Sequence, residues 1–235
     1  MKTTKFLMVL LIALLLFYPA TSKADSLLDT IYFEKFTNNG NPDVSGQLYV
    51  EIWDTGPTTP NTVGFKFFNT QAVTDSSIAQ IYFDDGALLG IASITNSGDG
   101  VNYTQPATPG ELPSANTLSP VFVTSTYFGV ALSAGGDPNQ KYGVDEFDEW
   151  VLIKFDLESG KTPASVLAAL AMDWNDPNFV NDGLRIGLHV QSIGNDLGFD
   201  GSDSYVNKVP EPGILILLGL AMSAIGVASW KIRKL

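Results

Sequence analysis

Carboxylates are the side chains of this 235-residue chain whose spacing most suggests chemistry. The densest run holds Asp145, Glu146, Asp148 and Glu149, directly before an alternating apolar stretch from Trp150 to Leu157. Calcium prefers hard oxygen ligands of this kind, so we treat these four residues as a candidate calcium site. The spacing is not that of an EF-hand, and a solvated approach to the next strand is the competing interpretation. Two Asx-rich segments, 173–182 and 195–203, are similar candidates that turn chemistry also explains.

Histidine and cysteine chemistry is nearly absent from the chain. His189 is the one histidine and there is no cysteine, so a structural zinc site is excluded. No nucleophile elbow, P-loop or dinucleotide fingerprint is present. His189 alternates with Ile186, Leu188 and Val190, which predicts a solvent-facing strand histidine. A glycosidase needs only two carboxylates placed by the fold, so a glycan hydrolase or lyase stays open as an alternative.

Two aromatic residues suggest sugar binding. Tyr49 and Trp53 lie on the face of the stretch Gln47 to Trp53 opposite its aliphatic residues, which are Leu48, Val50 and Ile52. Exposed rings on that face would stack on a pyranose, as in a carbohydrate-binding module. The competing interpretation is that other segments cover both faces of the sheet.

The charge of the chain is strongly acidic. Between Asp25 and Lys208 there are 24 Asp and Glu against 7 Lys and Arg, a net charge of 7 − 24 = −17. Binding to phosphate requires a basic surface, so nucleic acid is excluded as a partner. The same charge favours solubility or divalent cation binding, and without cysteine no disulfide stabilises the body.

Period-2 alternation predicts an all-β domain over residues 25–208. The alternating segments are 47–53, 63–67, 81–83, 128–132, 150–157 and 184–190, with a last strand near Tyr205, and clusters of Gly, Pro and Asx separate them. We expect an antiparallel β-sandwich, jelly-roll-like, in which the proline-rich stretch 103–120 crosses between sheets. One short helix is predicted from Ala164 to Met172, with Thr162 as N-cap and Pro163 in its first turn.

The N-terminus has the pattern of a signal peptide. Lys2 and Lys5 precede the apolar stretch from Phe6 to Tyr18, which is short for a transmembrane helix. Small residues around Lys23 form a signal peptidase motif, so we expect cleavage after Ala24 and a signal peptide over residues 1–24.

The C-terminal segment combines a proline motif, an apolar helix and a basic end. The motif consists of Val209, Pro210, Glu211 and Pro212 and precedes residues 213–230. Within these, the apolar stretch from Ile214 to Trp230 holds 17 residues without a charge. At ~1.5 Å per residue those residues reach roughly 25 Å, enough to span a thin bilayer core.

A basic stub follows the apolar stretch. Lys231, Arg233 and Lys234 mark the cytoplasmic side, so the body is expected outside the inner membrane.

This combination over residues 209–235 resembles the PEP-CTERM sorting signal of Gram-negative bacteria. The resemblance implies recognition by an exosortase, cleavage near residues 210–212, and release of the body to the cell surface or exterior in cells that make exopolysaccharide. It says nothing of the activity of the body. We expect an exported, non-enzymatic surface or biofilm-matrix protein that passes through a membrane-anchored intermediate and is associated with exopolysaccharide.

Overall fold

The computed structural model describes residues 24–56, 59, 61–72, 74–86, 88–98, 100–131, 140–194 and 201–208. Their strands are β1 (Ser26–Lys35), β2 (Leu48–Asp54), β3 (Thr62–Asn69), β4 (Ser77–Asp85), β5 (Leu89–Asn96), β6 (Tyr103–Thr104), β7 (Thr126–Val130), β8 (Val151–Leu157), β9 (Leu184–Ile193) and β10 (Gly201–Asn207). The helices are α2 (Pro163–Leu170) and α3 (Phe179–Asp182), with 3-10 turns η1 (Ser45–Gln47), η2 (Ala115–Thr117) and η3 (Gln140–Tyr142).

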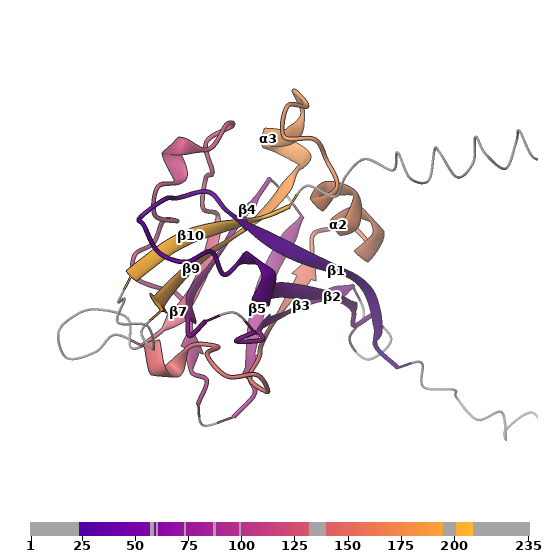
Figure 1. Cartoon of the computed structure of the whole chain (residues 1–235). Coiled ribbons are helices and arrows are strands. Elements are labelled where there is room, and N and C mark those ends of the chain that lie inside the picture. The colour runs from indigo at the N-terminus through magenta and orange to yellow at the C-terminus, as the bar shows by residue number, and fades with distance from the viewer. Residues whose placement is uncertain are drawn as a thin grey trace, which may run out of the picture.

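The strands form one antiparallel sheet in the order β5-β8-β3-β2-β1-β10-β9-β4-β7-β6. Strand β1 pairs with β2 from Ser26 to Tyr32 and with β10 from Phe33 to Lys35, so it belongs to both halves of the sheet. Figure 1 shows β1 lying across the front of the molecule, between β2 and β3 on one side and β10 and β9 on the other. We call β5-β8-β3-β2-β1 half A and β1-β10-β9-β4-β7-β6 half B. The predicted all-β antiparallel class is confirmed.

The sheet curls until its halves pack against each other. Phe83 of half B lies with its ring centroid 4.9 Å from that of Phe155 and within 5.2 and 6.2 Å of Phe65 and Phe67, all in half A. All four rings are fully buried. Burying one such side chain contributes about 1.5–3 kcal/mol, so this aromatic cluster is a main reason why the sheet stays curled.

The curl also brings the two edges of the sheet together. The edge strands β5 and β6 follow one another in the chain, and Asn96 Oδ1 accepts a hydrogen bond from Tyr103 N at 3.1 Å. This contact ties the start of β6 to the end of β5. Exposed strand edges invite pairing with other chains, so bringing these two edges together limits that hazard.

The predicted helix is present as α2. Its N-terminus is a capping box, in which Thr162 Oγ1 accepts from Ser165 N and Ser165 Oγ accepts from Thr162 N, each at 3.3 Å. The prediction of a single helix is wrong, because α3 forms four residues of helix after the turn at Asp176. Among residues 24–208, where they are described, no helix is long and apolar enough to cross a bilayer. The predicted span at 213–230 lies outside the described residues.

The segment between β6 and β7 covers one face of the sheet. It was expected to cross between sheets, but β6 and β7 are neighbours, so it returns to the same half. Its side chains Leu112 and Phe122 form a second apolar cluster with Tyr82 and Val206, on the outer face of half B. Half B is therefore buried on both faces. Among the described residues, side chains on the outer face of half A, such as Tyr49, Lys66 and Phe68, stay partly exposed.

Arg185 anchors this covering segment to the sheet. Its Nη1 donates to Pro120 O at 2.7 Å, its Nη2 donates to Val121 O at 2.8 Å, and the guanidinium pairs with Asp84. The guanidinium also lies 5.2 Å from the centroid of the Phe122 ring. A planar cation with donors in a fixed fork suits such a clamp, which lysine would not reproduce.

Candidate functional site: an aromatic face and an acidic pocket

An aromatic row crosses the outer face of half A. Tyr32 of β1 faces Tyr49 of β2, and Tyr49 faces Phe68 of β3, with ring centroids 6.0 and 4.7 Å apart. Trp150 directly precedes β8, whose pairing with β3 ends at Val151 and Phe67, and the Lys66 ammonium lies near the rings of both Trp150 and Phe68. Alternation fixes this arrangement, because the neighbouring residues of these strands point into the core. We call Tyr32, Tyr49, Phe68 and Trp150 the aromatic row.

The rings of the row differ in what they offer to a ligand. Tyr49 and Phe68 stack at an interplanar angle of 10°, so each covers a face of the other. Tyr32 is tilted by 40° from Tyr49 and is 50 % exposed. Burial raises the pKa of the Tyr49 hydroxyl, with Glu51 adding to the effect, so this hydroxyl stays protonated and able to donate. The row thus presents two stacked rings and the Tyr49 hydroxyl in its middle, and the half-exposed Tyr32 ring at the β1 end.

Trp53 lies on the same face as the row, further along β2. Its Nε1 donates to Glu51 Oε2 at 3.0 Å, so the indole is held along the strand. A Cβ on Gly64, opposite Trp53, would lie 3.7 Å from Trp53 Cβ and 3.0 Å from Leu152 Cδ1. The glycine therefore lets these two side chains lie close over the sheet, where they form an apolar floor.

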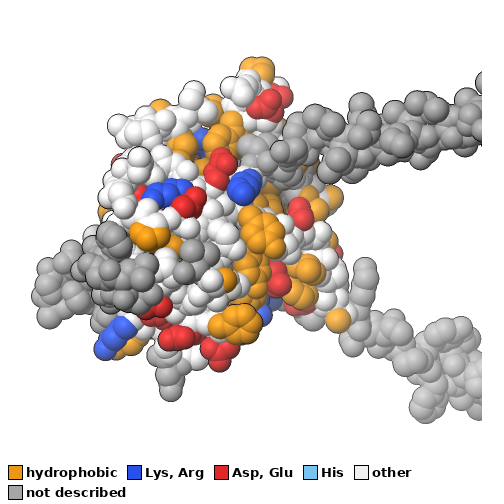
Figure 2. Space-filling model, in the orientation of Figure 1, with side chains coloured by type: hydrophobic (Ala, Val, Ile, Leu, Met, Phe, Trp, Pro, Cys, Tyr) orange, Lys and Arg blue, Asp and Glu red, His pale blue; other side chains and the backbone are white. Residues whose placement is uncertain are grey.

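A lysine completes the row. Lys66 Nζ lies 4.2 Å from the centroid of the Trp150 ring and 5.1 Å from that of Phe68. A cation held over aromatic faces at these distances gains a favourable interaction with the rings. Figure 2 shows hydrophobic side chains gathered in a band over the region of β1 and β2, with acidic side chains among them.

The structure thus places the two predicted sugar-binding residues, Tyr49 and Trp53, on one accessible face. Sequence reasoning missed Tyr32, Phe68 and Trp150. Alternation within 63–67 left Phe68 on the outer face, and that signal could have found it. Tyr32 was missed because β1 has a bulge between Leu27 and Asp29 that breaks its period.

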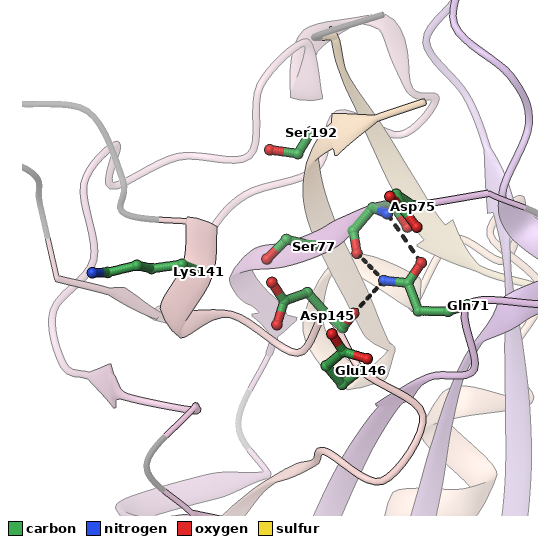
Figure 3. A pocket seen from close by; sticks show the side chains of 8 residues that line it. Gln71, Asp75, Ser77, Lys141, Asp145, Glu146 and Ser192 are labelled. Carbon is green, nitrogen blue, oxygen red and sulfur yellow. Dashed lines mark hydrogen bonds between the residues drawn. The ribbon is translucent and has the colours of Figure 1, made fainter. Parts of the chain in front are cut away.

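The predicted calcium ligands are only partly brought together. Asp145 and Glu146 line a pocket of about 370 Å³ whose other lining residues are Gln71, Asp75, Ser76, Ser77, Lys141 and Ser192. In Figure 3 the Gln71 amide nitrogen donates to the backbone oxygen of Asp145, at 2.6 Å, and the Lys141 side chain extends away from the acids. The pocket is polar and carries a net negative charge.

Glu149 has another role. Its Oε2 accepts from Asp145 N at 2.9 Å and from Glu146 N at 3.1 Å, so it closes the turn that precedes β8. Asp148 is exposed outside the pocket lining. Within the part of the chain that the structure describes, no three His, Asp or Glu side chains are grouped so as to hold a metal ion. In segment 173–182, Asp173 and Asp176 cap Asx turns, as turn chemistry predicts.

Asp145 is electrostatically unusual. Burial, followed by the hydrogen bond and the negative charge of Glu149 and then the charge of Glu146, raises the pKa of Asp145 to about 7. Like charges held close together disfavour the ionised form in this way. A carboxyl group with such a pKa both holds and releases a proton near neutral pH.

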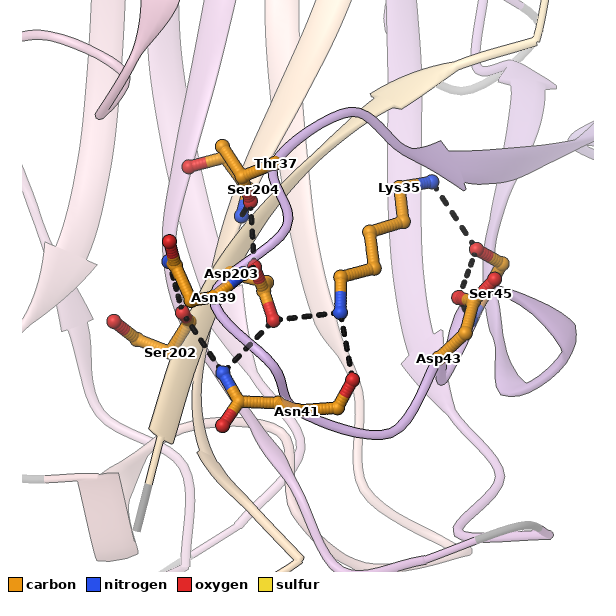
Figure 4. A network of polar contacts seen from close by, with 9 residues as sticks. All are labelled: Lys35, Thr37, Asn39, Asn41, Asp43, Ser45, Ser202, Asp203 and Ser204. Atoms are coloured by element: carbon orange, nitrogen blue, oxygen red, sulfur yellow. Dashed lines mark hydrogen bonds and ion pairs between the residues drawn. The ribbon is translucent and has the colours of Figure 1, made fainter.

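Asp203 is the centre of a structural network rather than of a binding site. Its carboxylate accepts from Lys35 Nζ at 2.8 Å, Asn41 Nδ2 at 2.9 Å, Thr37 Oγ1 at 2.7 Å and Asn39 N at 3.2 Å (Figure 4). Burial alone would raise the pKa of Asp203, but these donors lower it below its usual value. The network ties the segment after β1 to β10. Part of the other Asx-rich candidate, 195–200, lies outside the described residues.

His189 is buried, so the prediction of a solvent-facing histidine is wrong. Its side chain is 8 % exposed, because the segment between β6 and β7 covers half B. Gln80 Nε2 donates to Thr108 O, which leaves Gln80 Oε1 at 2.6 Å from His189 Nδ1, so Nδ1 carries the proton. Burial lowers the pKa of His189 to about 4. The residue is a neutral structural donor at neutral pH.

The predicted processing sites stay predictions. Ala24 is exposed at the start of the described residues. The motif at 209–212, the apolar segment 213–230 and the cations Lys231, Arg233 and Lys234 lie outside them. The chain matches no family model, and neither a curated protein nor a solved structure shows significant similarity to it.

Proposed function

We propose that this chain is an exported, non-enzymatic protein of the bacterial surface or extracellular matrix that holds exopolysaccharide. In this proposal residues 1–24 direct export, residues 213–230 hold an inner-membrane intermediate, and an exosortase then cuts near residues 210–212. The resemblance of residues 209–235 to a PEP-CTERM signal supports the sorting steps. The acidic charge of the body supports a partner other than nucleic acid.

The observation that carries the binding role is the aromatic row on the outer face of half A. Rings on the outer face of a β-sheet offer large apolar area at low entropic cost, and hydroxyls and charged groups beside them offer hydrogen bonds. The segment between β6 and β7 covers the outer face of half B. The side chains on the outer face of half A stay partly exposed. The finer fold class, a jelly-roll-like β-sandwich, belongs to this proposal. The face-to-face packing of the halves around Phe83 supports it.

Binding without turnover is the test. The full-length chain, purified in a non-ionic detergent, is passed over the host's own exopolysaccharide immobilised on beads. We expect saturable retention, no release of reducing ends, and weaker retention of the Trp53→Ala and Trp150→Ala variants. Phe147→Ala is the matched control, because Phe147 is 75 % exposed and lies outside the aromatic row. Equal retention of all four proteins would contradict the proposed face.

A glycan hydrolase or lyase is the second candidate, and the pKa of Asp145 favours it. A carboxyl group that titrates at about 7 in a polar pocket suits a general acid, and Glu146 or Asp75 would then act as its charged partner. Cleavage of the same polysaccharide by the wild-type chain, abolished in Asp145→Asn, would replace the non-enzymatic proposal with this one.

A further inference from the structure

Two lysines lie on the outer face of half A. In the antiparallel pair β3–β8, Lys66 faces Leu152 and Gly64 faces Lys154. Lys66 and Lys154 are therefore diagonal neighbours, a relation that places residues roughly 7–8 Å apart. The Lys66 ammonium extends toward Trp150 and Phe68, away from Lys154, so the two ammonium groups occupy separate positions on this face. Both side chains point away from the core, because their neighbours Phe65 and Phe155 are buried in it.

Neither lysine has an acidic partner, although acids outnumber bases by 24 to 7 between residues 25 and 208. Within the described ranges, the ion pairs are Lys35–Asp203 and Arg185–Asp84. Glu51 is the residue opposite Lys66, but its carboxylate accepts from Trp53 Nε1 instead. Each of the two ammonium groups would gain favourable Coulomb energy from an anion that approaches it.

The surface around the lysines suits a sugar ring. Leu152 and Trp53 form the apolar floor over Gly64, next to Lys154 in the register. Trp150 lies beside Lys66. A pyranose that carries a carboxylate would place its apolar face on this floor and its charge beside Lys154, and the carboxylate of a neighbouring sugar unit would reach Lys66 beside Trp150.

We propose that the outer face of half A binds a carboxylate-bearing polysaccharide of the uronic acid type, with Lys66 and Lys154 reading the carboxylates. The inference rests on the proposed function and adds the class of polymer. The net charge of the body repels such a polymer at long range, but the Debye length is about 8 Å at physiological ionic strength. Contact with the two lysines therefore decides binding under those conditions, and high salt weakens it.

Polygalacturonate and its fully methyl-esterified form test the charge directly, because they share one backbone and differ in the carboxylate. Binding of the full-length chain in non-ionic detergent is measured at 0.15 M salt. We expect tighter binding to polygalacturonate, weakened about two- to fivefold by Lys66→Gln or Lys154→Gln, the range of exposed charge pairs. Lys161→Gln is the matched control, because it removes the same charge from the loop before α2.

The outcomes separate this inference from the proposed function. Equal affinity for both polymers, unchanged in the lysine variants but lost in Trp150→Ala, overturns the inference that the lysines bind carboxylates. The glycan-binding role would then still stand. Failure to bind either polymer or the host polysaccharide overturns both. Concentration-dependent self-association that Lys66→Gln abolishes overturns the inference in favour of a second copy of the chain as the occupant.

Discussion

Lys35 Nζ lies 2.8 Å from Asp203 Oδ2, and this contact joins the end of β1 to β10 where β1 passes from one half of the sheet to the other. The Asp203 side chain is fully buried and that of Lys35 is 12 % exposed. Because the carboxylate has four donors, its ionised form is satisfied without water. The pair therefore holds the segment between β1 and η1 against the sheet.

Removal of the Asp203 carboxylate should destabilise the fold. Asp203→Ala leaves the ammonium of Lys35 buried without a counter-charge, and breaking a buried pair in this way costs about 3–5 kcal/mol. Lys35→Met should cost less, because three other donors still satisfy Asp203. Urea unfolding at pH 7 measures both, with Asp176→Asn as control, since an exposed Asx-turn residue tolerates this exchange. Equal stability of Asp203→Ala and wild type would contradict the role of the network.

His189 should make the fold sensitive to acid. The pKa of His189 falls from 6.5 to about 4 on folding, so the folded state prefers the neutral ring. The resulting stability is complete above pH 6.5 and is lost as the pH falls toward 4, by roughly 3 kcal/mol in total. In His189→Asn the amide nitrogen replaces Nδ1 as the donor to Gln80, so the loss between pH 6.5 and 4 should shrink. Unfolding free energies of both proteins at pH 7, 5.5 and 4.5 measure this difference, and parallel curves would rule out His189 as the cause.

Asp145 should act in the opposite direction. Its pKa rises from 3.8 to about 7 on folding, so the folded state prefers the protonated form and loses stability as the pH rises through that range. Asp145→Asn should therefore raise the melting temperature at pH 8 and change it little at pH 4. Thermal unfolding at the two pH values checks the sign. A lower melting temperature in the variant at pH 8 would show that the ionised carboxylate is needed.

Calcium is tested on the same pair of proteins. If the predicted ligands Asp145 and Glu146 hold calcium in their pocket, millimolar calcium at pH 8 should raise the melting temperature of the wild type by mass action and chelator should reverse it. Asp145→Asn should not respond. Identical melting temperatures in calcium and in chelator would show that this pocket does not bind calcium.

Strand identity could be predicted from the sequence where one face is buried. Val151, Ile153 and Phe155 are buried and alternate with less buried residues, of which Lys154 and Asp156 are charged, and β8 is found there. Strand β1 was missed because its bulge breaks the alternation, and β5 was missed because Gly90 and small residues weaken its pattern. Periodicity indicates the two faces of a strand but not what covers each face. The sequence therefore predicts a solvent-facing His189, although the residue is buried.

The candidate site was predictable in part, because alternation indicates the face of a strand on which each side chain lies. Alternation places Tyr49 and Trp53 on one face, but the neighbours Tyr32 and Phe68 come from pairing between strands, which a local pattern does not fix. The acidic run predicted converging carboxylates. Backbone N–H groups recruit Glu149 into the turn instead, and hydrogen bonds of this kind compete with any ligand role.

The last prediction concerns the processing of the C-terminal sorting tail. Pro210 and Pro212 lack backbone donors, and a proline disfavours helical backbone at the residue before it, here Val209 and Glu211. We therefore expect the segment to stay outside the following helix and accessible to a protease. Mass spectrometry of the C-terminus in the native host, by cell fraction, should find the body cut near these residues at the surface or outside the cell. A variant in which residues 210–212 are all alanine should stay full-length in the inner membrane. Cleavage at the same place in this variant would argue against recognition of the motif, and full-length chain in the cytosol with both ends intact would refute the export route.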